Sequence, residues 1–412
     1  MGFTKRQMME DEERGWSSSN SFVCNNCIDT PFLKSLVTKN AVENSCDFCG
    51  STSSKPIAAH LDILMEAIYG TLTYYFTDSS SANFDCDDGD YFSSTTTTAE
   101  ALFDLDLSCS ANLMEQILDS INSDLWFERG SGESSWSRQN KILSYTWRDF
   151  ERKVKHRTRY FFHRPSSSSD DDLDNFEPQD ILGQIAGIII ENGLIKTLKQ
   201  GLPLFRCRLI SKNDNWECNA NQLGAPPNIL ARAGRMNPAG ISYFYTALRP
   251  STAIAETVGH PPVSFVLSKF TNARQITVVD LCNLPEYPPI FDVEAQSLRE
   301  RIIFLYDFRD AISRPISKDG SEHIDYVPSQ VVSEYFAQLL KIDDDQFGVD
   351  GVIYPSTVMK GGANLVLFPN NRRLTKEFDF VELVDFVERE LNNWDDLTNS
   401  LFPENGEENY GI

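Results

Sequence analysis

Two cysteine pairs near the amino terminus constrain the fold of this chain more than any other feature. Cys24 pairs with Cys27 and Cys46 with Cys49 in two CxxC motifs, which residues 28–45 separate. Four thiolates at this spacing can converge tetrahedrally on one zinc ion. Four protein ligands leave no coordination position for water, so such an ion stabilises a fold and does not catalyse. The spacing therefore predicts a zinc-ribbon module over residues 1–54.

The alternatives for these cysteines are a pair of disulfides or a redox motif. Residues 1–14 are charged and lack an apolar core, and no run of about 18 apolar residues occurs, so no secretory signal or membrane segment is expected. The chain has nine cysteines, an odd number, and those outside the two pairs are scattered. Reduced thiols fit this pattern, and we expect a cytoplasmic protein.

Composition narrows the possible partners. The chain has 412 residues, of which 41% are hydrophobic and 24% charged, so it is long enough for two or three domains with their own cores. Its net charge of −23 and pI near 4.6 argue against broad nucleic-acid binding, because phosphate backbones are held by clustered lysine and arginine. Binding of nucleic acid is therefore not expected.

Helical periodicity dominates the rest of the amino-terminal half. Apolar residues at helical spacing predict an amphipathic helix over residues 61–72, further helical material around residues 102–121, and a long helix with a basic end over residues 141–160. We therefore expect a helical bundle over residues 55–164. The Ser/Asp-rich stretch over residues 165–178 predicts a linker, since it cannot bury enough apolar surface to order itself.

The carboxy-terminal half alternates short apolar runs with helical patterns. A buried helix over residues 181–198 leads into a strand around Phe205, and further strands and helices are expected at residues 263–267, 276–279, 352–354 and 365–368, and at residues 292–312 and 329–340. This alternation predicts an α+β domain over residues 179–377, followed by an acidic helix and tail over residues 378–412. The Gly-rich signatures of Rossmann and P-loop folds are missing from the sequence.

The stretch over residues 234–256 sets an arginine, an aromatic residue and a carboxylate in order around a turn. Arg235 lies in a glycine- and proline-rich loop, Tyr245 in a short apolar run, and Glu256 on a helix expected to begin near Pro250. These groups suit cleavage of the nicotinamide–ribose bond of NAD. Arginine grips phosphate oxygens, tyrosine stacks on a cationic ring, and a carboxylate near the ribose stabilises an oxocarbenium-like transition state.

Each of the three residues also has an ordinary structural explanation. An arginine in such a loop is usually solvated, a tyrosine in an apolar run is usually part of the core, and a glutamate on a helix is usually exposed. The combination favours a functional site more than any one of its members does.

The chain resembles the RES-domain toxins, a family named after an arginine, a glutamate and a serine. Besides Tyr245 and Glu256 at the family's spacing, the resemblance depends on five segments: residues 204–208, 233–240, 326–330, 350–356 and 361–364. Met236 departs from the pattern, because many relatives carry an aromatic residue there. The resemblance covers about half of the chain and implies an ADP-ribosyltransferase-like fold that degrades NAD by hydrolysis or phosphorolysis.

The resemblance also implies roles for single residues. Arg206 and Arg235 would bind the phosphates, Tyr245 would pack on the nicotinamide side, Glu256 would serve the ribose, and Ser329 would help to shape the pocket. The Ser329 hydroxyl could also cap the helix that follows it, and a capped helix N-terminus offers N–H groups to a phosphate. Family members are commonly paired with a small antitoxin, so an antitoxin or another regulatory protein is an expected partner.

The amino-terminal half is similar to the HEPN/RES amino-terminal domain, on the basis of the cysteine pairs and residues 147–162. HEPN proteins that cut RNA use an arginine and a histidine on one helix, with four to six residues between them. Here His156 follows Arg152 after three intervening residues and Arg148 after seven. The spacing argues against nuclease activity, and a solvated basic helix face explains His156 more simply.

The sequence leads to one main prediction, with alternatives from other classes. We expect a RES-type NAD glycohydrolase or phosphorylase that acts as a toxin, with structural zinc in its amino-terminal module. Transfer of ADP-ribose to a protein would use the same residues. A non-enzymatic interaction protein and an RNA-cleaving HEPN module are the further alternatives.

Overall fold

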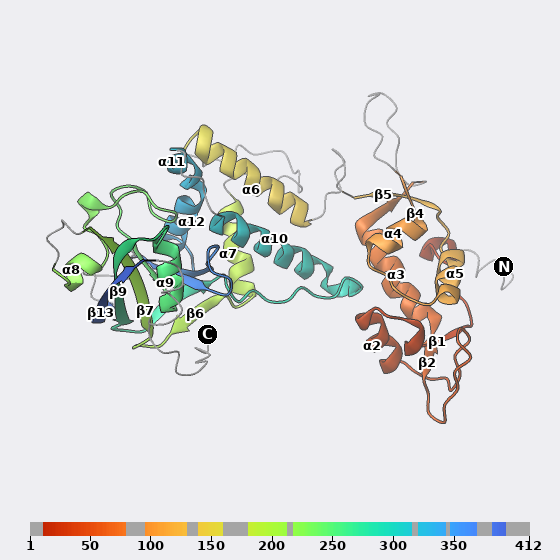
Figure 1. The fold of residues 1–412 in the computed structure, drawn as a ribbon. Coiled ribbons are helices and arrows are strands. Elements are labelled where there is room, and N and C mark those ends of the chain that lie inside the picture. The colour runs from red at the N-terminus through yellow and green to blue at the C-terminus, as the bar shows by residue number, and fades with distance from the viewer. Residues whose placement is uncertain are drawn as a thin grey trace. The chain divides into compact units, whose positions relative to one another are not determined.

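The computed structural model describes residues 11–79, 95–129, 139–159, 180–211, 217–314, 320–342, 347–368 and 381–392. These residues belong to two compact units, which are described separately here (Figure 1). The first unit consists of Met1–Ile142 and Glu286–Ile303, and the second of Leu143–Pro285 and Phe304–Ile412. The segment Glu286–Ile303 thus leaves the second unit in sequence and folds with the first.

The cysteine-rich part of the first unit contains a two-stranded antiparallel sheet. Strand β1 (Phe22–Cys24) pairs with β2 (Ala58–His60), and the 3₁₀ helix η1 (Asn25–Cys27) follows β1 directly. Helix α2 (Pro31–Lys39) starts with proline in its first turn, where the missing N–H costs nothing. Cys24 and Cys27 therefore lie at the end of β1 and in η1, and the second cysteine pair lies in the loop that leads to β2.

Three further helices and a small sheet lie in the described part of the first unit. Helix α3 (Leu61–Tyr75) confirms the amphipathic helix expected over residues 61–72, and its apolar stripe is buried. Helices α4 (Thr98–Asp104) and α5 (Ala111–Ser120) account for the helical material expected around residues 102–121. The three-stranded sheet has the order β3 (Phe76–Asp78), β5 (Leu125–Glu128) and β4 (Thr96–Thr97).

The segment Glu286–Ile303 is held in the first unit by buried contacts. Phe291 is part of the same hydrophobic core as α3. The Tyr75 hydroxyl lies 2.8 Å from Gln296 Oε1 and 3.0 Å from Glu300 Oε1, and all three side chains are buried. This association joins residues more than 200 positions apart, and nothing in the local sequence predicts it.

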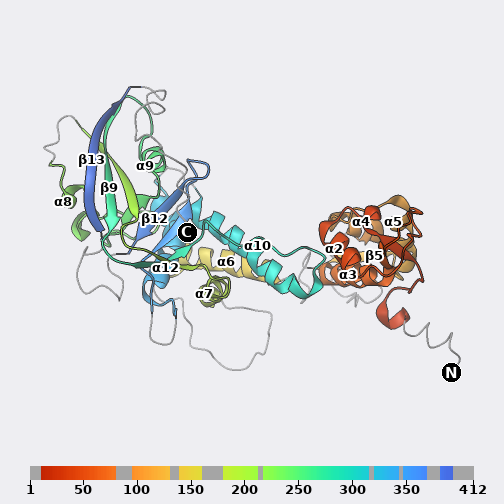
Figure 2. The same cartoon turned by 90° about the horizontal axis from the view of Figure 1, so that it is seen from below.

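The second unit is built on an eight-stranded mixed sheet. Its order is β13–β9–β7–β8–β12–β11–β10–β6, and all neighbours are antiparallel except the parallel pair β10 and β11. Figure 2 shows β13, β9 and the strands beside them at one end of this sheet. The strands are β6 (Ile195–Leu198), β7 (Pro203–Ile210), β8 (Phe244–Ala247), β9 (Val263–Asn272), β10 (Ile276–Asp280), β11 (Gly351–Pro355), β12 (Ala363–Leu367) and β13 (Val381–Leu391).

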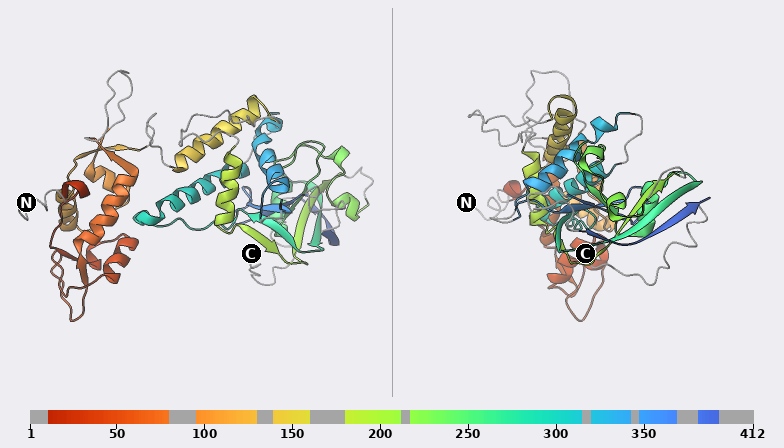
Figure 3. Two further views of the ribbon diagram at one scale, coloured as in Figure 1. Left: turned by 180° about the vertical axis from the view of Figure 1, so that it is seen from behind. Right: turned by 90° about the vertical axis from the view of Figure 1, so that its left-hand side faces the viewer.

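Helices cover this sheet and bury its apolar side chains. One core joins side chains from four long helices to β11 and β12, and Figure 3 shows these helices beside the sheet. Helix α9 (Pro250–Thr257) packs its residues Ala253 and Ile254 on β7 and β9 in a separate cluster. The helices are α6 (Gln139–His156), α7 (Ile181–Glu191), α8 (Ala220–Leu223), α9 (Pro250–Thr257), α10 (Gln296–Ser313), α11 (Glu322–Asp325) and α12 (Val327–Gln338), with 3₁₀ turns η2 (Asn228–Leu230) and η3 (Val293–Ala295).

The α+β class expected for the chain is confirmed, with the four cysteines near the amino terminus and the mixed sheet in the carboxy-terminal half. Two elements were predicted wrongly. The helix expected over residues 181–198 ends at Glu191, and residues 195–198 form strand β6, because they pair with β10 at the edge of the sheet. An acidic helix was expected over residues 378–412, but residues 381–391 form strand β13, which pairs with β9 along its length. The reason is tertiary pairing, which satisfies the backbone of β13 although charged residues interrupt its apolar positions. Residues 393–412 lie outside the described residues.

The division between the units differs from the predicted one. The linker expected over residues 165–178 lies outside the described residues, whereas the compact units divide between Ile142 and Leu143. The physical reason is that Leu143, Trp147 and Phe150 of α6 are buried in the core of the second unit. Among the described helices, none combines the length and apolar character needed to cross a bilayer.

Candidate active site

Helix α12 binds the loop over residues 234–237 through its side chains. All four backbone carbonyls of the loop accept hydrogen bonds from it: Gly234 and Asn237 from Gln330 Nε2 at 2.9 and 3.0 Å, Arg235 from Ser329 Oγ at 2.5 Å, and Met236 from Ser333 Oγ. The three donor side chains are buried. Because a buried carbonyl without a partner is costly, this set of bonds fixes the backbone of the loop.

Ser329 lies near Arg235, but it is not a helix cap. Helix α12 begins at Val327 with Tyr326 as its N-cap residue, and no side chain caps it. Pro328 occupies the first turn and moves the helix start upstream of Ser329, so the predicted capping role is wrong. The hydroxyl instead has two carbonyl neighbours, Arg235 at 2.5 Å and Tyr326 at 3.0 Å.

The phenol of Tyr245 is bound to the same loop. Its oxygen accepts a hydrogen bond from the Met236 N–H at 2.9 Å and donates to Asn237 Oδ1 at 2.8 Å. Burial raises the pKa of Tyr245, which keeps the hydroxyl protonated and able to donate. Gly234 has no side chain for a steric reason, since a Cβ there would lie 2.6 Å from Asn237 Oδ1 and 2.9 Å from the Tyr245 hydroxyl.

Asn237 is the buried centre of this loop. Its side chain is 3% exposed, and Nδ2 lies within hydrogen-bond distance of three carbonyls, those of Arg232 (2.9 Å), Pro238 (3.1 Å) and Ile241 (2.8 Å). One amide group therefore closes the loop on itself and also positions the Tyr245 hydroxyl.

The guanidinium of Arg235 is half-buried at the carboxy-terminal end of α10. Its Nη1 donates to the carbonyls of Ile312 at 3.2 Å and Arg314 at 2.5 Å. The last carbonyls of a helix lack intrahelical partners and favour a cation, so this contact orients the side chain. Within the part of the chain that the structure describes, Nε and Nη2 of Arg235 make no hydrogen bond, which leaves them for an anion.

Glu256 lies on α9, whose start at Pro250 agrees with the sequence, and its side chain is exposed. Its Oε1 accepts hydrogen bonds from Ser356 Oγ at 2.7 Å and from Asn364 Nδ2 at 2.6 Å. Ser356 directly follows β11, and Asn364 lies in β12. Sequence reasoning assigned neither residue a role, although both lie in segments that carry the RES resemblance.

Tyr354 is a buried tyrosine next to the candidate residues. It is buried in β11, and burial raises the pKa of Tyr354. The neighbouring Tyr245 and Glu256 raise this pKa further, whereas the charge of Arg235 lowers it. The contacts around it are direct: the loop that carries Arg235 binds the Tyr245 hydroxyl, and Asn364, the cross-strand partner of Tyr354, binds Glu256.

Strand register agrees with this grouping. Tyr354 is the cross-strand partner of Asn364, and Tyr245 is the partner of Val366. Residues 364 and 366 of β12 point to the same face, because side chains alternate along a strand. Tyr245, Tyr354 and the Asn364 side chain that binds Glu256 therefore share one face of the sheet.

Arg206 lies on the other face. Its guanidinium stands over the ring of Phe244, 5.3 Å from the centroid, and Nη1 donates to the Tyr245 carbonyl at 2.9 Å. Phe244 and Tyr245 are successive residues of β8, so their side chains point to opposite faces. Burial lowers the pKa of Arg206 to about 10, and its buried Nε has no partner among the described residues. Arg206 thus contacts the backbone of Tyr245 from the opposite face of the sheet.

Two family models match the chain. The model described as "RES domain" matches residues 203–386, which include Arg235, Tyr245, Glu256 and Ser329. The model described as "HEPN/RES N-terminal domain 1" matches residues 39–168. The chain carries a RES domain. The segment Glu286–Ile303, which folds with the first unit, lies inside the range of the RES-domain match.

Other comparisons add little to this assignment. One similar solved structure is titled "Crystal structure of the M.tuberculosis MbcT-MbcA toxin-antitoxin complex". It is 14% identical in sequence, the match covers 50% of this chain and 92% of that chain, and the TM-score is 0.27. A TM-score of this size supports no inference about function. No curated protein matches the chain significantly.

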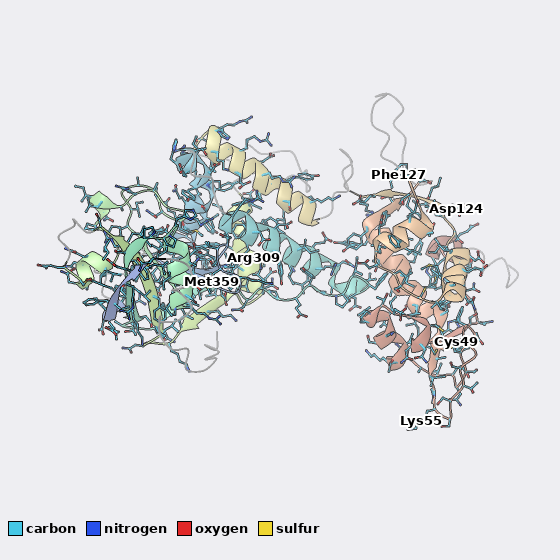
Figure 4. All side chains as sticks on the ribbon, in the orientation of Figure 1. Cys49, Lys55, Asp124, Phe127, Arg309 and Met359 are labelled. Atoms are coloured by element: carbon cyan, nitrogen blue, oxygen red, sulfur yellow. The ribbon has the colours of Figure 1, made fainter. Side chains whose placement is uncertain are left out.

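Outside the RES domain, the four paired cysteines form the candidate metal centre. Their Sγ atoms all lie within 4.8 Å of one another, with 3.9 Å from Cys24 to Cys27, 3.5 Å from Cys24 to Cys49 and 3.7 Å from Cys27 to Cys46. A tetrahedral site with zinc–sulfur bonds of about 2.3 Å requires sulfurs about 3.8 Å apart. These separations are too long for disulfides, so the arrangement fits a metal ion. Figure 4 marks Cys49 at this centre.

Among the residues that the structure describes, the basic end of α6 forms no comparable cluster. His156 is exposed on the last turn of the helix, and Arg152 makes an ion pair with Asp149. Nothing in these contacts favours the RNA-cleaving alternative.

Proposed function

We propose that the RES domain cleaves the nicotinamide–ribose bond of NAD, with water or phosphate as the acceptor. The observation that carries the proposal is a set of contacts within the segment that matches the RES-domain model: the loop of Arg235 binds the Tyr245 hydroxyl, and Tyr245 shares one face of the sheet with the Asn364 side chain that binds Glu256. The family resemblance implies NAD as the substrate, and the contacts of the three residues are compatible with it.

The three residues would have separate roles in the binding and cleavage of NAD. Arg235 has two guanidinium nitrogens that no described residue uses, and they suit a pyrophosphate oxygen. The Tyr245 hydroxyl is held by the 234–237 loop, so the face of its ring is the part that would meet the cationic nicotinamide. Glu256 has Oε1 occupied, and Oε2 would accept a ribose hydroxyl and stabilise positive charge that develops as nicotinamide leaves.

Nicotinamide release tests the proposal. Purified full-length protein with NAD, with and without phosphate, should release nicotinamide, and Glu256→Gln should lower the rate by about 10²- to 10³-fold at an unchanged melting temperature. Glu382→Gln on strand β13 is the matched control, because it makes the same change on an exposed strand remote in sequence. Unchanged turnover in Glu256→Gln would rule out the role given to this carboxylate.

The fate of ADP-ribose separates the possible acceptors. With NAD labelled in its adenosine part, label on small molecules alone supports degradation, and label on protein supports ADP-ribosyl transfer. The resemblance further predicts a toxin with a neutralising antitoxin. Expression of the wild-type chain should then lower cellular NAD and stop growth, and expression of Glu256→Gln should do neither.

We also propose that the four-cysteine centre holds structural zinc. The sulfur separations near 3.8 Å support this, and three of the four cysteines are buried and would be costly to bury as thiolates without a cation. Metal analysis should find about one zinc per chain, and Cys46→Ala should remove it, whereas Cys218→Ala should not. Near-zero zinc in protein that is folded over residues 22–60 would refute the assignment.

A further inference from the structure

The exposed position of Glu256 on α9 leaves its carboxylate without support from its own helix. A long exposed side chain keeps most of its rotamer freedom, and that freedom must be lost before a carboxylate can act on a defined atom. The support comes from the residue that follows β11 and from the start of β12. Ser356 and Asn364 both reach Oε1 of this one side chain.

The direction of these two bonds is determined by the other contacts of the donors. Ser356 Oγ accepts hydrogen bonds from the backbone N–H groups of Met359 at 3.0 Å and Val358 at 3.3 Å, so its single hydrogen is left for Glu256. Asn364 approaches through Nδ2, which can only donate, and its side chain is 6% exposed. Both groups therefore donate to the same carboxylate oxygen, and Oε2 is left without a partner among the described residues.

The turn that carries Ser356 is packed against the same helix. The Ser356 N–H donates to the Gly362 carbonyl at 2.8 Å, which closes the turn, and Met359 is labelled there in Figure 4. A Cβ at Gly362 would lie 2.7 Å from Thr252 Oγ1, so the turn approaches α9 closely. Thr252 and Glu256 are four residues apart and lie on one face of α9. Helix and turn thus hold the carboxylate and its donors in register.

We propose that Ser356 and Asn364 are positioning residues for the NAD-cleaving reaction. They hold Oε1 of Glu256 and direct Oε2 toward the ribose, so the carboxylate is oriented before substrate binds. Preorganised groups of this kind act on the transition state more than on the bound substrate. The inference rests on the proposed function, since it concerns the same carboxylate.

The test measures kcat and KM for nicotinamide release in full-length variants. Ser356→Ala and Asn364→Ala should each lower kcat by about 10- to 100-fold, with KM within about three-fold of wild type, because misplacement of a catalytic group by about 1 Å has this effect. Ser356→Thr keeps a hydroxyl and should recover most of the loss. Val358→Ala changes an exposed side chain of the same turn that does not touch Glu256, and it is the control.

The possible outcomes separate the two proposals. Wild-type protein that leaves NAD intact overturns both. Active wild type with kcat unchanged in Ser356→Ala and Asn364→Ala overturns the positioning role alone, as does a rise in KM at unchanged kcat, which would mean that the two residues bind substrate directly. Should Asn364→Ala fail to fold, the half-buried Ser356 still decides the question through its Ala and Thr variants.

Discussion

The bond between Tyr245 and Asn237 offers the sharpest quantitative test of the site. Tyr245→Phe removes a hydroxyl that makes two hydrogen bonds, one to the Met236 N–H and one to Asn237 Oδ1. At about 1 kcal/mol net for each bond, the loss should be about 2 kcal/mol. Asn237→Ala removes the same shared bond and about two more from the Nδ2 hydrogens, so its loss should be about 3 kcal/mol.

The double variant distinguishes a network from independent contacts. Because one bond is counted in both single variants, Tyr245→Phe/Asn237→Ala should lose about 4 kcal/mol, about 1 kcal/mol less than the sum of the single losses. The assay is a urea titration that yields the free energy of unfolding, and its signal should come from the second unit. Hydrogen exchange of the Met236 amide adds a local measurement. Among the described residues, this N–H donates its hydrogen bond to the Tyr245 hydroxyl alone.

The refuting results are definite. Losses that add to within about 0.3 kcal/mol would mean that the two side chains do not share a bond of consequence. A loss below about 0.5 kcal/mol in Tyr245→Phe, with unchanged exchange at Met236, would mean that the hydroxyl does not hold the loop. Tyr245→Phe keeps the aromatic ring, so KM for NAD should rise only as far as the loop loosens.

Three further predictions concern other parts of the chain. Gly234→Ala should lower the melting temperature and raise KM for NAD at least ten-fold, because its Cβ would lie 2.6 Å from Asn237 Oδ1. Gly259→Ala is the control and should change neither quantity, because a Cβ there has no atom within 4 Å. Arg206→Met should lower the melting temperature and leave KM within about three-fold of wild type, because the guanidinium donates to a β8 carbonyl. A ten-fold rise in KM at unchanged stability would instead support a role of Arg206 in binding the phosphates. Tyr75→Phe should cost the first unit about 1–2 kcal/mol and speed hydrogen exchange over residues 286–303, and unchanged exchange there would contradict the anchoring role of its hydroxyl.

Local periodicity explains why some elements could be predicted from the sequence. Helix α3 has Leu61, Leu64 and Ile68 on one stripe, and all three are buried as expected. Strand β13 lacks such a signal, since acidic residues interrupt its apolar positions and a register shift between Leu383 and Asp385 disturbs the alternation of faces. Its strand conformation depends on pairing with β9, which no local pattern encodes.

The candidate site shows the same limit. Arg235, Tyr245 and Glu256 were named from side-chain chemistry and family resemblance, but the groups that hold them come from distant positions. Asn364 lies 108 positions from Glu256 in sequence, and Gln330 lies 96 positions from the loop carbonyl of Gly234. A single sequence carries no record of such pairings, so the supporting residues could be found only from the fold.

The segment Glu286–Ile303 limits the ways in which such a protein could have arisen by gene fusion. A gene fragment that encodes only residues 203–386 would produce Phe291 and Gln296 without the buried surroundings that α3 supplies. The two halves can therefore not be exchanged independently. Recombination at their boundary would leave apolar residues exposed to solvent in both products. Lineages that carry this segment should inherit the amino-terminal half and the enzyme-like half together.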